Sequence, residues 1–388
     1  MSLGGSIKRL VIPGLITLEI FFISWYGIYL NEILDEEFTA KRWNLPSRIY
    51  SQEEALYPGF NVHQRDLKGK LDRLGYREKG EIHLPGEYKI TPSYWEIYLN
   101  DFSYPSLEFK GYPLRIKLDG TGTVQEILHL GTGEPIPRAE VEPELLATLF
   151  SEDMEDRSWV RLEEVPPHLI GAVLSIEDAR FYEHPGVDLI GILRASVVNL
   201  YHGEIIQGGS TLTQQLIKNV LSKWEKTFLR KLNEIFLALM LETRYSKEQI
   251  LELYLNEIYL GQDGTVSISG VKEGARYYFS KEIRYLSVAE SALLAGLIKA
   301  PNTYSPFQDP QKAKARRDLV LKQMYDQGKI SQELYLQALA EELPVEAGGS
   351  LTGRKRTTKQ APYFVDYVIE QLKSRYPYEE LKTRGYKI

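Results

Sequence analysis

The chain has 388 residues, of which 43% are hydrophobic and 26% charged, a composition typical of globular domains rather than of disordered chains. Its net charge of −6 argues against bulk nucleic-acid binding, so no nucleic-acid partner is expected. Because there is no cysteine, disulfides, thiolate nucleophiles and cysteine metal sites are excluded. The six histidines form no His-Glu-x-x-His pair, which argues against a zinc hydrolase.

The N-terminal region has the pattern of a membrane anchor. Residues 10–30 read LVIPGLITLEIFFISWYGIYL, close to the roughly 20 residues that a helix needs to cross a bilayer. Basic residues end the tail 1–9, and acidic residues follow at 35–37, which predicts an N-terminus inside and the remainder outside the inner membrane. A cleaved signal peptide is the alternative, but no small-x-small cleavage site follows the apolar run.

Residues 48–142 differ in composition from the residues after them. Tyrosine, glycine and proline are frequent, and short alternating runs at 87–90 and 114–118 predict strands. One helix is expected at 64–74. The pattern predicts a small α/β domain, and because it holds no candidate nucleophile–base pair, binding is a better expectation for it than catalysis.

The chain becomes strongly helical over residues 143–345. Apolar positions at helical spacing predict helices at 247–259, 287–298 and 310–327. Residues 346–388 begin with a glycine-rich basic stretch and are interpreted as a linker with the start of a further region. An apolar run at 189–201 fits either a membrane-dipping surface or an amphipathic core helix.

The segment SIEDARFYEHPG, residues 175–186, crowds acidic side chains, Arg180 and His184 after an apolar run. A carboxylate at the edge of an apolar wall can have a raised pKa, which suits general acid or base chemistry. Taken alone, the segment fits equally a helix end with ordinary surface charges.

The segment GGSTLTQQLIKN, residues 208–219, places glycines and hydroxyls before a helix. Backbone N–H groups and hydroxyls at such a position can bind an anion, although a flexible loop with a hydroxyl N-cap has the same pattern.

A basic cluster follows, and it ends in a carboxylate. Positions 223, 226, 230 and 234 step by three, four and four residues, so they share one helical face. Fixed cations of this kind suit a pyrophosphate leaving group, whereas the alternative is a solvated basic helix. The cluster consists of Lys218, Lys223, Lys226, Arg230 and Lys231.

Together, these blocks resemble glycosyltransferase family 51, the peptidoglycan polymerase domain of class A penicillin-binding proteins. The matching blocks are, in order, EDARFYEHPGVD (177–188), GGSTLTQQLIKN (208–219), RKLNE (230–234), ILELYLNEIYLG (250–261) and AESALLAGLIKAPNTYSP (289–306). Residues 48–142 are also similar to the small module that precedes this domain in the 1b type.

The resemblance implies roles for individual residues. Glu177 would be the general base and Glu234 the second catalytic carboxylate, assisted by a divalent cation such as Mg²⁺, with no organic cofactor. Three cations would hold the donor pyrophosphate: Lys218, Lys226 and Arg230. Three residues would line that site: Ser210, Thr211 and Gln215. Three would shape the pocket around the base: Asp178, Phe181 and His184.

The resemblance also implies the fold class and partners. It implies an α+β multidomain chain with one transmembrane helix, a small α/β domain and a mostly helical, lysozyme-like glycosyltransferase domain. Lipid II and lipid-linked glycan would be substrates at the membrane, moenomycin an inhibitor, and an outer-membrane lipoprotein activator and the cell-wall machinery partners.

Two other functions remain open. One is a glycan-cleaving enzyme, and another is a membrane scaffold that recruits an envelope activator. The Ser-x-x-Lys at 269–272 lacks the companion motifs of a transpeptidase, so peptide cross-linking is not expected.

Overall fold

The computed structural model describes residues 25–32, 34, 45–104, 107–151, 154–203, 208–220, 228–342 and 361–388. The chain divides into two compact units. The first comprises residues 177–257 and the N-terminal segment to 43, and the second comprises 44–176 and 258–388.

Some expectations concern residues outside the described part. They are Lys223 and Lys226 of the basic cluster, most of the expected membrane span, 10–30, and the glycine-rich stretch that begins residues 346–388. Among the helices that the structure describes, none is both long and apolar enough to cross a bilayer.

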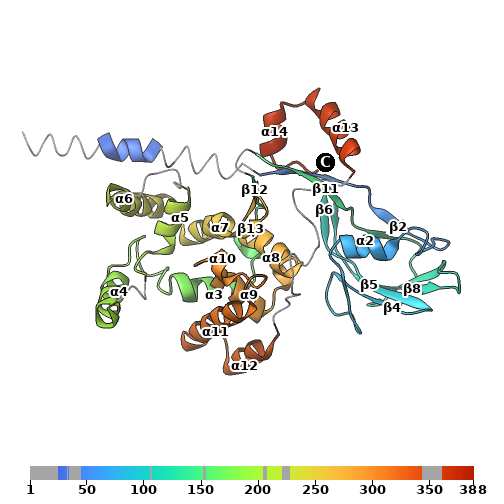
Figure 1. The fold of residues 1–388 in the computed structure, drawn as a ribbon, viewed down its shortest axis with the longest axis horizontal. Coiled ribbons are helices and arrows are strands. Elements are labelled where there is room, and N and C mark those ends of the chain that lie inside the picture. The colour runs from blue at the N-terminus through green and yellow to red at the C-terminus, as the bar shows by residue number, and fades with distance from the viewer. Residues whose placement is uncertain are drawn as a thin grey trace, which may run out of the picture. The chain divides into compact units, whose positions relative to one another are not determined.

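The small domain, in the second unit, is built on a five-stranded sheet against which one helix packs (Figure 1). Strand β8 alternates as its sequence predicts, since Leu114 and Ile116 are buried and pair with Ile97 and Trp95. The strands, in sheet order, are β3 (Arg77–Glu78), β4 (Glu87–Ile90), β5 (Tyr94–Tyr98), β8 (Pro113–Leu118) and β9 (Val124–His129). The helix is α2 (Leu67–Arg73), whose Leu67 and Leu71 enter the core. The predicted strands at 87–90 and 114–118 are confirmed, and the helix starts later than expected because Asp66 caps it.

Besides this sheet, the described residues form three two-stranded sheets. They are β1 (Ser47–Tyr50) with β11 (Leu145–Leu149), β2 (Glu54–Leu56) with β10 (Ala139–Val141), and β6 (Phe102–Tyr104) with β7 (Leu107–Phe109).

The C-terminal segment packs on the first of these pairs. Helices α13 (Pro362–Lys373) and α14 (Tyr378–Thr383) bury Val365, Ile369 and Leu381 against β1 and β11. The last residues then run beside β1, where the Arg48 N–H donates to the Tyr386 carbonyl at 2.8 Å. Residues 346–388 were expected to be a linker and the start of a further region. The part of them that the structure describes, 361–388, contains α13 and α14 and is hydrogen-bonded to β1.

The rest of the second unit is mainly helical. Helix α9 begins at a capping box formed by Ser287 and Glu290, and it packs on α11. The predicted helices at 287–298 and 310–327 are therefore confirmed. The elements are β12 (Glu155–Asp156), η1 (Leu162–Glu164), α3 (Pro167–Glu177), β13 (Tyr259–Asp263), β14 (Val266–Ser269), α8 (Val271–Phe279), η2 (Ile283–Tyr285), α9 (Val288–Leu297), α10 (Pro301–Tyr304), α11 (Pro310–Asp326) and α12 (Gln332–Ala340).

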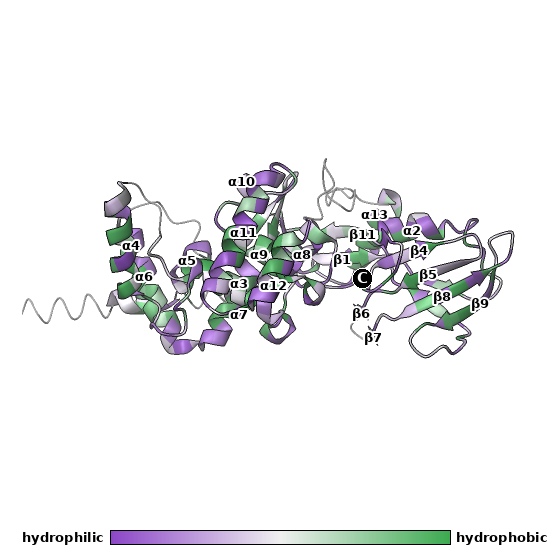
Figure 2. Cartoon of the chain, turned by 90° about the horizontal axis from the view of Figure 1, so that it is seen from below, coloured by the Kyte–Doolittle hydropathy of each residue, from purple (hydrophilic) through white to green (hydrophobic). Residues whose placement is uncertain are grey.

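Residues 177–257 of the first unit form helices α4 to α7, with α5 packed against α6 and α7. They are α4 (Leu189–His202), α5 (Leu212–Val220), α6 (Phe228–Arg244) and α7 (Lys247–Glu257). Helix α7 ends two residues before the predicted 259, because Tyr259 already belongs to β13. Helix α4 leaves large apolar side chains in solvent, including Leu193 at 67% and Leu200 at 85% exposure, and Figure 2 shows hydrophobic residues along it.

Candidate active site

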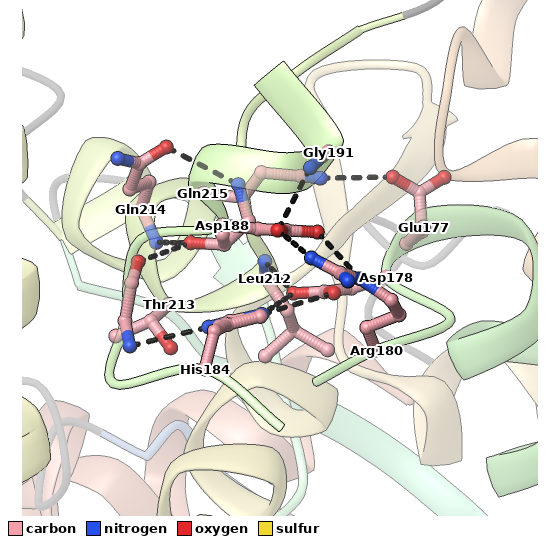
Figure 3. Close-up of polar contacts among 12 residues, drawn as sticks. Glu177, Asp178, Arg180, His184, Asp188, Gly191, Leu212, Thr213, Gln214 and Gln215 are labelled. Atoms are coloured by element: carbon pink, nitrogen blue, oxygen red, sulfur yellow. Dashed lines mark hydrogen bonds and ion pairs between the residues drawn. The ribbon is translucent and has the colours of Figure 1, made fainter. Parts of the chain in front are cut away.

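Glu177 is the last residue of α3, and a side chain from α5 holds its carboxylate. The Nε2 of Gln215 donates to Glu177 Oε2 at 2.9 Å (Figure 3). The Oε1 of the same amide accepts from the hydroxyl of Tyr254 on α7 at 3.2 Å. Glu177 is half-buried, so its carboxylate is oriented by protein and still reachable by a ligand.

Asp178, the next residue, is buried and fixes the loop after α3. Its Oδ2 accepts the Leu212 N–H at 2.9 Å, which satisfies a donor at the N-terminus of α5. The Nε2 of His184 lies 3.1 Å from both Asp178 oxygens, and the Gly186 N–H donates to His184 Nδ1. Because Nδ1 accepts, the ring proton lies on Nε2 and is donated to Asp178 (Figure 3).

The hydroxyl-rich segment, residues 208–219, is held by a capping box at the start of α5. The Gln214 N–H donates to Thr211 Oγ1, and the Thr211 N–H donates to Gln214 Oε1, both at 3.2 Å. The Thr211 hydroxyl itself donates to the carbonyl of Gly186 at 2.6 Å. At Gly186 φ is +91°, and a Cβ there would lie 2.8 Å from the Ala238 carbonyl oxygen, so only glycine fits this contact.

Arg180 and Asp188 close the other end of the loop. Asp188 caps α4 by accepting the Gly191 N–H at 2.8 Å, and the Arg180 guanidinium pairs with its carboxylate. Burial acts to raise the pKa of Asp188, but the hydrogen bonds from Arg180 and Gly191 outweigh it, so the net pKa is lowered.

A partly buried ion pair, between Lys247 and Glu242, joins the loop to α6 and α7. Lys247 donates to the His184 carbonyl at 2.6 Å and to Glu242 at 2.8 Å, and its ammonium lies 4.4 Å from the centre of the Phe181 ring. Glu242 also accepts from the hydroxyl of Thr213 at 2.6 Å. Loop, α5, α6 and α7 are therefore connected through one network.

Glu234 is buried on α6 between two cations. Arg230 Nε lies 3.3 Å from Glu234 Oε1, and Lys231 Nζ lies 3.1 Å from Oε2. Lys231 also donates to the Ser210 hydroxyl at 3.0 Å. The hydroxyl-rich segment thus contacts the Glu177 carboxylate directly, through Gln215, and is linked to Glu234 through Lys231, which Ser210 contacts.

Most of the residues singled out by sequence are brought together in this way. Lys218 is exposed near the end of α5, and Lys226 lies outside the described residues. Three contributors carried no predicted role: Lys231, Lys247 and Tyr254. Lys231 belongs to the basic cluster at three residues from Glu234, a signal that could have identified it, whereas Tyr254 has the pattern of an ordinary core position.

Glu234 faces protein cations in this structure. Mg²⁺ prefers near-octahedral oxygen coordination, whereas both Glu234 oxygens lie beside cationic side chains. The divalent cation implied by the resemblance stays a prediction. Within the described ranges no group of three His, Asp or Glu residues could hold a metal ion. Arg230 and Lys231 supply positive charge at this carboxylate.

Two regions of the chain match known protein families. Residues 142–325 match the Transglycosylase family, and residues 56–140 match the family described as the bifunctional transglycosylase second domain.

Among similar relatives, Penicillin-binding protein 1B of Buchnera aphidicola is 37% identical over 346 residues, covering 89% of this chain and 45% of the relative. The Vibrio cholerae protein of that name is 36% identical over 344 residues, covering 89% and 44%. The Escherichia coli protein is 33% identical over 353 residues, covering 91% and 41%.

The chain therefore spans less than half the length of these relatives. The region that matches the bifunctional transglycosylase second domain comes first in the chain, and the region that matches the transglycosylase family follows it. Glu177 and Glu234 both lie in the transglycosylase region. The chain belongs to the transglycosylase family, with a bifunctional transglycosylase second domain before its transglycosylase domain.

Proposed function

We propose that the chain is a peptidoglycan glycosyltransferase that polymerises lipid II into β-1,4-linked glycan strands and releases undecaprenyl pyrophosphate. One observation supports this above others: the hydroxyl-rich segment joins an amide-held carboxylate, Glu177, to a carboxylate flanked by two cations, Glu234. A base and a fixed cationic site are the two elements that displacement of a pyrophosphate by a hydroxyl requires.

In this proposal Glu177 accepts the proton of the acceptor 4-hydroxyl as its oxygen attacks the donor anomeric carbon. The bond from that carbon to the pyrophosphate breaks, and the electron pair leaves with the pyrophosphate. Arg230, with Lys231 beside it and Lys218 and Lys226 as further cations, stabilises the developing charge. A single displacement at an α-linked donor gives a β linkage.

Glu234 assists on the donor side in the same proposal. Asp178 and His184 attach the loop that follows Glu177 to the start of α5. The ring of Phe181 packs against the ammonium group of Lys247. Ser210 and Thr211 keep the hydroxyl-rich segment beside both groups. These residues orient the two ends of the site so that acceptor and donor meet in line.

The proposed setting is the extracytoplasmic face of the inner membrane, with residues 10–30 as a single-pass anchor and the N-terminus inside. The exposed apolar side chains of α4 suit contact with lipid, because both substrates are lipid-linked. The small domain is proposed to dock an envelope activator such as an outer-membrane lipoprotein.

The test is to incubate the purified chain with lipid II in one reaction and with preformed peptidoglycan in another. The proposal predicts glycan polymer and undecaprenyl pyrophosphate in the first and no soluble fragments in the second. Soluble fragments from preformed peptidoglycan, without polymer from lipid II, would instead identify a glycan-cleaving enzyme.

A further inference from the structure

Tyr254 lies directly behind the amide that holds Glu177. It is on α7, is fully buried, and donates its hydroxyl proton to Gln215 Oε1 at 3.2 Å. Burial raises the pKa of Tyr254 well above its ordinary value, and the negative charges of Glu177 and Asp178 raise it further. The hydroxyl is therefore protonated at all working pH values and available as a donor.

The two ends of a glutamine amide are nearly equal in shape but opposite in hydrogen bonding. An ionised carboxylate only accepts hydrogen bonds, so Gln215 must turn its NH₂ group toward Glu177. The opposite orientation would bring the amide oxygen against the Glu177 oxygen. What selects between the two orientations is the group at the other end of the amide.

We propose that Tyr254 is a positioning residue for the catalytic base: its hydroxyl fixes the orientation of the Gln215 amide, which in turn fixes the Glu177 carboxylate. A tyrosine hydroxyl can also accept a hydrogen bond, but the negative charges of Glu177 and Asp178 act on Tyr254, and its hydroxyl donates to Gln215 Oε1. The inference rests on the proposed function, because the Tyr254–Gln215 contact matters for catalysis only if Glu177 is the base that deprotonates the acceptor.

Tyr254→Phe removes the hydroxyl and keeps the ring in the core. Without the donor, the amide samples both orientations, and Glu177 loses its fixed hydrogen bond for part of the time. We expect kcat for lipid II polymerisation to fall about tenfold, because general-base catalysis depends on geometry, while KM changes less than about twofold. Tyr278→Phe is the matched control, since Tyr278 is also buried and its hydroxyl donates to the Leu260 carbonyl at 2.6 Å.

A double-mutant cycle separates positioning from general destabilisation. In a Gln215→Ala background, Tyr254→Phe should have no further effect on kcat, because the amide through which it acts is gone. An equal loss of kcat in both backgrounds, or wild-type kcat in Tyr254→Phe alone, overturns the proposal. A rise in KM with unchanged kcat overturns it as well.

A second readout does not depend on activity. The side-chain amide resonance of Gln215, assigned by its loss in Gln215→Ala, should shift in Tyr254→Phe and stay in place in Tyr278→Phe. If the wild-type chain makes no glycan, the proposed function fails, and this shift still decides whether Tyr254 holds the amide. An unshifted resonance refutes the contact itself.

Discussion

At the scale of single residues, Asp178 is surrounded by donors. Its buried carboxylate accepts from the Leu212 N–H and from His184 Nε2. Each such bond to a charged group is stronger than one between neutral groups. The carboxylate therefore joins the start of α5 to the loop that follows Glu177.

Asp178→Asn should destabilise the chain, because the amide has one oxygen for two donors and turns its own NH₂ group toward one of them. The expected loss in the free energy of unfolding is about 2 kcal/mol, measured as a shift of the denaturation midpoint. Asp326→Asn is the control, because Asp326 pairs with Lys322 on the exposed side of α11. An equal shift in both variants would show that the Asp178 contacts carry no particular stability.

Sequence reasoning could select Glu177, Glu234 and Gln215 because their types and spacing form blocks that resemble a known family. Their catalytic roles stay predictions. It could not select Tyr254, since an aromatic core position at helical spacing looks the same whether or not its hydroxyl meets a functional side chain. Lys247 was equally hidden, because its partner Glu242 precedes it across the break between α6 and α7.

At the scale of elements, strand β1 is anchored by a buried ion network in the second unit. Arg48 of β1 lies 2.7 Å from Asp156 of β12 and 3.0 Å from Glu273 of α8. Arg276 pairs with Glu273 at 3.0 Å and with Glu282 at 2.7 Å. Since both carboxylates that face Arg48 are buried, this guanidinium balances charges that water cannot solvate.

Arg48→Met should lower the free energy of unfolding by about 3 kcal/mol, because it leaves buried charge with fewer partners. Thermal unfolding at pH 7 measures this loss. Arg161→Met is the matched control: Arg161 also pairs with two glutamates, Glu163 and Glu164, but its side chain is 67% exposed. A midpoint shift no larger than that of the control would contradict the assigned importance of the network.

Elements with strong local signals were predicted closely. Helices α9 and α11 combine apolar periodicity with a capping residue, Ser287 or Asp309, and both were placed to within a residue or so. Strand β13 was missed because the helical pattern continues to Tyr259 in sequence. Its partner β14 follows a turn at Gly264, and pairing of this kind is decided by packing rather than by periodicity.

At the scale of the whole molecule, the second unit joins distant parts of the chain. Strand β1 pairs with β11, and helices α13 and α14 cover both, so residues some three hundred positions apart share one small core. Local patterns cannot reveal such packing, which joins residues 361–388 to β1 and β11. The mixed α+β class and the presence of a small domain before a helical one were predictable from composition and periodicity.

The proposed membrane contact can be tested on the whole chain because it has no native cysteine. A polarity-sensitive dye on Leu193→Cys or Leu200→Cys should shift to the blue when the chain is reconstituted in lipid vesicles, since the dye enters an apolar layer. The same dye on Leu336→Cys, an exposed position of α12, is the control. Equal spectra at all three positions would contradict the lipid contact of α4.

The most direct test of the central claim is the rate of lipid II polymerisation by Glu177→Gln beside Glu183→Gln. Each change neutralises one carboxylate, at the end of α3 or in the loop just after it, but only Glu177 is held by Gln215, whereas Glu183 is exposed. The proposed base predicts that Glu177→Gln lowers kcat at least about a hundredfold while Glu183→Gln polymerises at the wild-type rate. Wild-type polymerisation by Glu177→Gln would contradict the assignment of the base.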